Sequence, residues 1–256
     1  MERGNINLRH KLTALPFRKI APNMVTTLAI CVGVTSMRYA ITENWGKAVI
    51  CIFIAAILDM LDGRVARMLK GSTKFGAELD SLSDFVSFGV APAILMYKWT
   101  LYDFPRFGWF FCLLFPVCMA MRLARFNTML ENNPQPDYWR NFFVGVPAPA
   151  AAMLGILPIM LSFEFEAEFL RSNWFCCTVM FIVAMLMVSH IPTISVKYMK
   201  IPTYMMLPLL VVIVLFATMM LSQPWMVMNI MMMMYIASLP VGIIWFMRAK
   251  KAANRI

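Results

Sequence analysis

Residues 59–84 read DMLDGRVARMLKGSTKFGAELDSLSD and place four aspartates in one short stretch of an otherwise apolar chain. Asp59 and Asp62 are three positions apart, and Asp80 and Asp84 are four apart. In an α-helix these spacings put both members of a pair on one face. The short segment between the pairs predicts a turn that joins two antiparallel helices, so the two pairs are expected to face each other.

The composition of the chain indicates that the lipid bilayer is its solvent. Of its 256 residues, 61% are hydrophobic and only 14% are charged, and the mean hydropathy is +0.71. A water-soluble domain is about half apolar and about a quarter charged, so a soluble globular fold is excluded. The six cysteines lie in apolar stretches without metal-site spacing and are interpreted as packing residues.

The apolar segments predict an all-α polytopic membrane protein with about eight transmembrane helices. A helix needs about 20 apolar residues to cross the hydrocarbon core. Segments of that kind, separated by short polar breaks, cover residues 24–41, 48–68, 82–99, 107–123, 144–163, 174–190, 204–221 and 225–247.

The basic residues predict the orientation, because loops on the cytoplasmic side of a membrane collect Lys and Arg. With both termini inside, 18 of the 23 Lys and Arg residues fall on the cytoplasmic side. The formal charge of +10 is explained in this way, so no nucleic-acid partner is expected. Residues 1–21 form a basic segment, expected either as an amphipathic helix on the membrane surface or as a basic tail.

The four carboxylates would repel one another at a membrane edge unless protons or a bound cation neutralised them. Their oxygen atoms favour magnesium, manganese or calcium over zinc, and no His or Cys lies nearby in the sequence. We therefore expect a divalent cation, Mg2+ or Mn2+. Salt bridges to Arg64, Arg67 or Lys74 are the alternative, but they would account for only two of the four acids.

Small side chains beside the acids indicate a ligand that approaches the backbone. Gly63, Ala66 and Gly76 leave space on helices where larger side chains would otherwise fill it. Arg67 supplies a planar cation suited to phosphate. Together these residues favour a phosphate-containing ligand.

Read as a pattern, the opening stretch is D-x2-D-G-x2-A-R-x8-G-x3-D-x3-D, which resembles the signature of the CDP-alcohol phosphotransferases at every fixed position. The resemblance implies a six-helix catalytic core, expected over residues 22–190, with two additional helices and a basic tail over residues 191–256. It also implies that Asp59, Asp62, Asp80 and Asp84 hold one or two divalent cations on the diphosphate of a CDP-linked substrate. Asp84 is then expected to be the general base that takes the proton of an acceptor alcohol.

The start of the first helix adds to this resemblance. Pro22-Asn23-Met24-Val25-Thr26 is similar to the P-N-x-x-T entry of the family, which implies that Asn23 and Thr26 border the nucleotide. Without the resemblance, Asn23 would be interpreted as a helix cap. The residues that the resemblance assigns to the CDP-lipid are Asn23, Thr26, Asp62, Gly63, Ala66, Arg67 and Gly76.

The acceptor alcohol is predicted from residues 83–92, 122–127 and 144–152, which resemble the integral-membrane phosphatidylserine synthases of the family. This resemblance implies CDP-diacylglycerol and L-serine as substrates, in the cytoplasmic membrane and among its phospholipids. A serine pocket needs a cation for the carboxylate, and Arg125 and Asn127 are the candidates. The family also implies a homodimer.

Two alternatives remain open at this point. The same machinery could use another acceptor, such as glycerol 3-phosphate, choline or inositol phosphate. A divalent-cation transporter could use the same four aspartates as its ion site. Transport predicts acids near the middle of the bilayer, however, and gives no reason for the adjacent glycines, Ala66 and Arg67.

Overall fold

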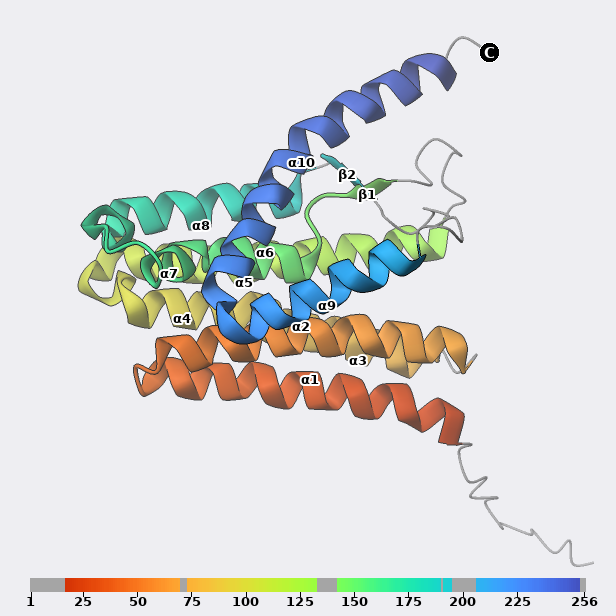
Figure 1. Cartoon of the computed structure of the whole chain (residues 1–256), viewed down its shortest axis with the longest axis horizontal. Helices are drawn as coiled ribbons and strands as arrows, with labels where there is room; N and C mark the ends of the chain where they lie inside the picture. The colour runs from red at the N-terminus through yellow and green to blue at the C-terminus, as the bar shows by residue number, and fades with distance from the viewer. Residues whose placement is uncertain (1–16, 70–72, 133–141, 190, 195–205, 254–256) are drawn as a thin grey trace, which may run out of the picture.

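The structure is a computed structural model that describes residues 17–69, 73–132, 142–189, 191–194 and 206–253. Its helices run mostly side by side, and the last helix crosses them obliquely (Figure 1). The helices are α1 (Phe17–Ile41), α2 (Trp45–Met68), α3 (Lys74–Asp84), η1 (Phe85–Val90), α4 (Ala91–Trp99), η2 (Leu101–Asp103), α5 (Pro105–Asn132), α6 (Ala148–Gly155), α7 (Leu157–Ser162), η4 (Glu168–Arg171), α8 (Asn173–Val188), α9 (Met206–Ser222) and α10 (Pro224–Ala253). Strands β1 (Phe142–Val144) and β2 (Pro192–Ile194) form a short antiparallel pair.

The predicted all-α polytopic membrane fold is confirmed. Within the described residues, four segments are long and apolar enough to span a membrane: Ala21–Ile41, Lys74–Trp99, Arg106–Met129 and Pro224–Met247. Helices α8 and α9 are apolar but shorter, and α2 is of similar length but carries charged residues toward its end. The total of eight spans stays a prediction.

The third span is longer than predicted and contains a π-helical segment. It begins at Lys74 rather than at residue 82, and α3, η1 and α4 follow one another without a break. Ser87 in the π-helical η1 donates a hydrogen bond to the carbonyl of Ala29 on α1 at 3.3 Å. A π-helical turn changes which side chains share a face, so η1 packs on α1 while α3 keeps its acids toward α2.

The predicted fifth span, residues 144–163, is wrong in its first part. Val144 lies in strand β1, and the helical region begins only at Ala148. The helix is then interrupted at Ile156 between α6 and α7. Proline explains the interruption, because Pro158 has no N–H to bond to the carbonyl of Leu154 and its ring disfavours a continuous helix there.

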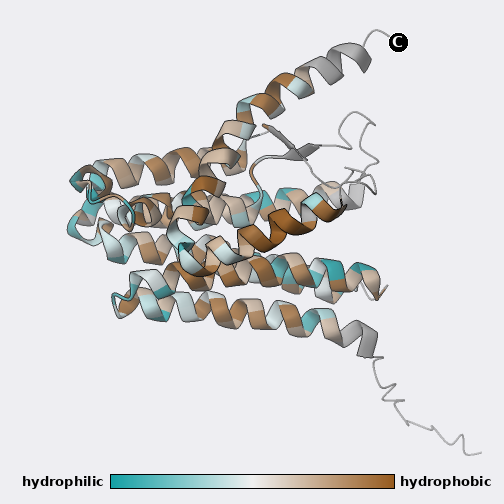
Figure 2. Ribbon diagram, in the orientation of Figure 1, coloured by the Kyte–Doolittle hydropathy of each residue, from teal (hydrophilic) through white to brown (hydrophobic). Residues whose placement is uncertain are grey.

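The other helix boundaries differ by a few residues from those predicted. Helix α5 ends at Asn132 rather than at residue 123, and α1 begins at Phe17 rather than at residue 24 and so continues into the basic segment predicted over residues 1–21. Residues 1–16 of that segment lie outside the described residues. Hydrophobic residues recur along most of the described helices (Figure 2).

The core lies between α2, α4, α5, α6 and α8, where small and sulfur-containing side chains let the helices approach closely. Cys112, Cys118, Cys176 and Cys177 are buried in it, and all six cysteines of the chain are free thiols. The interpretation as packing residues agrees with the placement of these four, whereas Cys31 is exposed and Cys51 is half-buried. In contrast, the described side chains of α9 are almost all exposed.

Candidate active site

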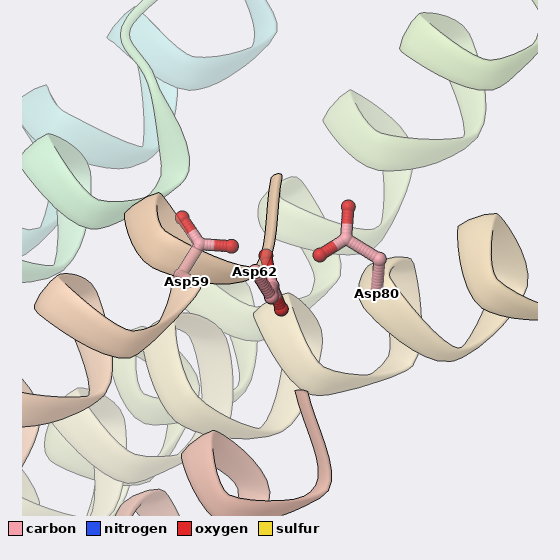
Figure 3. A group of neighbouring side chains, drawn as sticks. All are labelled: Asp59, Asp62 and Asp80. Carbon is pink, nitrogen blue, oxygen red and sulfur yellow. The ribbon is translucent and has the colours of Figure 1, made fainter. Parts of the chain in front are cut away.

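The aspartates predicted to meet do so at one end of the α2–α3 pair. Side-chain oxygen atoms of Asp59, Asp62 and Asp80 all lie within 4.8 Å of one another. Asp62 lies between the other two, and the three carboxylates gather in the space between the two helices (Figure 3). The side chain of Thr73 caps α3 by accepting a hydrogen bond from the Gly76 N–H at 3.0 Å, which sets the start of that helix.

Helix α1 contributes a hydrogen bond to this group. The hydroxyl of Thr26 donates to Oδ2 of Asp62 at 2.7 Å. Both residues are buried, with 4% and 5% of their surfaces exposed. This bond, together with a hydrogen bond from the backbone of Gly63, orients the carboxylate of Asp62.

Asp84 lies one helical turn after Asp80, at the end of α3. Its carboxyl group interacts with those of Asp59 and Asp80 and with the guanidinium of Arg122 on α5. Its Oδ1 atom is buried and accepts no hydrogen bond. An unpaired carboxylate oxygen beside two other acids is unfavourable unless a cation or a donor group binds there.

The donor set fits a hard divalent cation. Three carboxylates from two helices converge, a fourth lies beside them, and among the described residues no His or Cys joins the group. Such oxygen-only sets bind Mg2+ or Mn2+ together with substrate phosphates. Asp59, Asp62, Asp80 and Asp84 are therefore the residues that would hold the ion.

An open pocket of about 480 Å³ adjoins the acids. Six of the seven residues predicted to bind the CDP-lipid line it, and Arg67, the seventh, is exposed and not among the lining residues. The lining residues are Pro22, Asn23, Thr26, Asp62, Gly63, Ala66, Thr73, Gly76, Ala77 and Asp80. The pocket therefore joins α1, the end of α2 and the start of α3 beside the acids.

Gly76 has a steric reason to be glycine. A Cβ atom at this position would lie 2.9 Å from Oδ1 of Asn23 and 3.2 Å from Oγ1 of Thr73. Asn23 lies inside α1 rather than at its first residue, so the alternative interpretation of Asn23 as a helix cap is wrong.

The two residues predicted for the acceptor pocket lie in different surroundings. Nδ2 of Asn127 donates to the hydroxyl of Ser81 at 2.9 Å, next to Asp80. Arg125 instead donates to carbonyls at the end of α8, those of Val188 at 2.7 Å and Ser189 at 3.1 Å. Asn127 therefore lies next to the aspartates, whereas Arg125 binds the carbonyl groups at the end of α8.

Two polar residues of this region, Arg122 and Tyr235, are not among the predicted site residues. Arg122 lies in the stretch 122–127 that resembles the phosphatidylserine synthases, and its guanidinium interacts with Asp84, Asp59 and the hydroxyl of Tyr235 on α10. Arg122 precedes Arg125 by three positions, a spacing that could have drawn attention to it. Tyr235 follows a run of methionines, and no local signal marks it.

Comparisons with known proteins agree with this geometry. The family model described as CDP-alcohol phosphatidyltransferase matches residues 19–189. A second model, CDP-alcohol phosphatidyltransferase 2, matches residues 204–240, which include α9 and the first half of α10.

Curated relatives extend the likeness over most of the chain. The CDP-diacylglycerol–serine O-phosphatidyltransferase of Mycobacterium leprae is 40% identical over 225 residues, which is 88% of this chain and 75% of that protein. The protein of the same name from Mycobacterium tuberculosis is 41% identical over 72% of this chain and 64% of its own length, slightly under two thirds. That of Helicobacter pylori strain 26695 is 40% identical over 66% of this chain and 70% of its own length.

Proposed function

This chain belongs to the CDP-alcohol phosphatidyltransferase family, and from that premise we propose that it makes phosphatidylserine. The reaction transfers the phosphatidyl group of CDP-diacylglycerol to the hydroxyl of L-serine. A bond forms between the serine oxygen and the lipid-side phosphorus, the bond from that phosphorus to the oxygen of CMP breaks, and CMP leaves. The observation that carries the proposal is the convergence of Asp59, Asp62 and Asp80 beside a pocket in a chain similar to serine O-phosphatidyltransferases.

Four aspartates are proposed to hold the divalent cation, which, when bound, neutralises charge on the diphosphate and on the departing phosphate. Asp62 is oriented for this role by the hydroxyl of Thr26. Asp59 and Asp80 approach it from the two helices. The CMP-release assay described below compares Mg2+ with Mn2+.

Asp84 is proposed as the general base. Its Oδ1 atom is buried, accepts no hydrogen bond, and so can receive the proton of a serine hydroxyl. The carboxyl groups of Asp59 and Asp80 lie beside it, so the proposed base belongs to the same cluster as the acids proposed to hold the cation.

The pocket is proposed to bind the cytidine diphosphate end of the lipid. Asn23 and Thr26 border it from α1, and Gly63, Ala66 and Gly76 keep it open. Arg67 is exposed near the mouth and is proposed to attract phosphate. Asn127, and with it Arg125, stays a prediction for the serine pocket.

The placement in the cell is part of the proposal. The chain is a multi-pass membrane protein, and its family acts on membrane lipids. We place the site and both termini on the cytoplasmic face because most Lys and Arg residues gather there. A homodimer is proposed on the family resemblance.

The direct test is CMP release from CDP-diacylglycerol by the purified protein with Mg2+ or Mn2+. L-Serine, glycerol 3-phosphate, choline and inositol phosphate are offered separately. Release with serine alone is the expected result. Release only with another alcohol would refute serine as the acceptor but support the proposed metal and CDP-lipid site. No release with any of the four alcohols would favour the divalent-cation transporter as the explanation of the four aspartates.

A further inference from the structure

Three buried polar atoms without hydrogen-bond partners lie around the guanidinium group of Arg122. They are Oδ1 of Asp84 on α3, Nε of Arg122 itself on α5 and the hydroxyl of Tyr235 on α10. Arg122 interacts electrostatically with both of the others. Within the described residues none of the three atoms has a hydrogen-bond partner. Their proximity without mutual pairing is unusual, because buried polar groups are almost always paired.

The fourth such atom, Oδ1 of Asn229, belongs to a different place. Nδ2 of Asn229 donates to the carbonyl of Met160 at 3.1 Å and so ties α10 to α7. This amide serves as a structural contact, whereas the other three groups lie at Arg122, which interacts with Asp59 and Asp84.

The unpaired atoms indicate which hydrogen-bonding groups a ligand bound here would need. Arg122 Nε–H is a donor and the Tyr235 hydroxyl can donate, so both need an acceptor. Asp84 Oδ1 is an acceptor that needs a donor. L-Serine is the complement of this set, because its carboxylate accepts two hydrogen bonds and its hydroxyl donates one.

We propose that Arg122 and Tyr235 bind the carboxylate of the acceptor amino acid and thereby direct its hydroxyl toward Asp84. This inference rests on the proposed function and deepens it. It assigns a substrate contact to α10, which lies outside the six-helix core implied by the resemblance.

The packing of α10 positions Tyr235 for this role. Met228, Met232 and Tyr235 are spaced at i, i+4 and i+7 and so share one face of the helix. Met228 and Met232 are buried in the core. One end of α10 is held by Trp225, whose ring lies 4.4 Å from that of Phe163.

Arg122 is better placed than Arg125 to receive a carboxylate. The guanidinium of Arg125 already donates to carbonyls at the end of α8. In the described residues, Nε of Arg122 has no hydrogen-bond partner, and the guanidinium interacts with the proposed base. A planar guanidinium is also suited to bind a carboxylate through two hydrogen bonds.

The same chemistry would accept a phosphate in place of the carboxylate, as in glycerol 3-phosphate. It disfavours choline, which is a cation and offers no anionic group to Arg122. The experiment therefore compares L-serine with glycerol 3-phosphate and with serinol, which replaces the serine carboxylate by a neutral hydroxymethyl group.

The test uses Tyr235→Phe and Arg122→Lys in the full-length protein, with Tyr97→Phe as the matched control. Tyr97 is half-buried and lies in an aromatic cluster with Tyr102 and Trp109 on other elements. Tyr235→Phe and Arg122→Lys are each expected to raise KM for L-serine by about 10- to 100-fold, while KM for CDP-diacylglycerol stays within about twofold. The control should keep the parental values. The preference for serine over serinol, as a ratio of kcat/KM, should fall by a similar factor.

The ratio separates substrate contact from a structural effect. A variant that only disturbs packing would lower the rates with serine and serinol together and keep their ratio, and that result would overturn the inference. A parental serine KM in both variants would overturn it as well. If the parent protein uses glycerol 3-phosphate and not serine, the proposed function itself is refuted. If the parent uses serine and the variants keep its ratio of serine to serinol activity, only the role of Arg122 and Tyr235 is refuted.

Discussion

Replacing Thr26 with valine removes one hydrogen bond at the acids and keeps the shape of the side chain. In the parent protein the Thr26 hydroxyl donates to Oδ2 of Asp62 at 2.7 Å, and both residues are buried. Valine has the same branched outline but no donor. Among the described residues, the carboxylate of Asp62 then loses its side-chain donor and keeps only the backbone hydrogen bond of Gly63.

The expected magnitude follows from the chemistry of this bond. A hydrogen bond to a charged group contributes about 1.5–3 kcal/mol, and each 1.4 kcal/mol is a factor of ten in an equilibrium constant. The loss therefore corresponds to a 10- to 100-fold weaker affinity for the divalent cation, roughly the range seen when a partner of a metal ligand is removed.

The assay is a titration of CMP release against Mg2+ or Mn2+ at saturating CDP-diacylglycerol and L-serine. Thr26→Val should need 10- to 100-fold more metal for half-maximal rate and approach the parental rate at saturation. Thr35→Val is the matched control, because the Thr35 hydroxyl bonds only to the carbonyl of Cys31 in its own helix, at 2.7 Å. An identical metal dependence in Thr26→Val and the parent, or an equal shift in Thr35→Val, would refute the assigned role of Thr26.

Other changes test the remaining parts of the site. Asp84→Asn should lower kcat by about 10²- to 10⁴-fold while CDP-diacylglycerol still binds in part, whereas Asp62→Asn should impair metal-dependent binding; equal turnover of Asp84→Asn and the parent would remove the base assignment. Gly76→Ala should raise KM for CDP-diacylglycerol by about tenfold, because the added methyl group meets Asn23 and Thr73; an unchanged KM would show that the pocket relaxes. Alkylation of the thiols with N-ethylmaleimide should leave most of the activity, since four of the cysteines are packed in the core; inactivation that CDP-diacylglycerol prevents would contradict this. Arg125→Gln should lower the thermal midpoint, because it loses hydrogen bonds to the end of α8; a parental midpoint with a raised serine KM would instead support the serine role predicted from the sequence.

The convergence of the acids could be predicted because it depends on short-range geometry. Asp59 and Asp62 share a helix face by their spacing, and a short connection between helices leaves few ways to pair them with Asp80. The pocket residues followed from a motif in which small side chains mark the space that a ligand needs.

The fifth predicted span shows where apolar windows mislead. Hydrophobicity counts Val144 and Pro158 as compatible with a helix, but it does not register the missing N–H of proline or the pairing of β1 with β2. Strand pairing joins residues far apart in the sequence, so a short apolar stretch carries no local pattern that predicts it.

The residues on the acceptor side of the site could not be predicted from the sequence, because they too are brought together by packing between distant segments. Which of Arg122 and Arg125 points to the acids depends on the rotation of α5 in the bundle, and packing sets that rotation. Helix α10 crosses the bundle (Figure 1), and its Tyr235 interacts with Arg122. Composition identified α10 as a membrane helix but did not indicate this interaction.

The distance in sequence between the four aspartates and Tyr235 has a consequence for biogenesis. A polypeptide is synthesised from its N-terminus, so α2 and α3 can associate and bring their acids together before α10 leaves the ribosome. The acceptor side would be completed only when α10 inserts and packs on α7. A nascent chain would thus hold its charged centre before it could bind the acceptor, which would delay catalysis until α10 is in place.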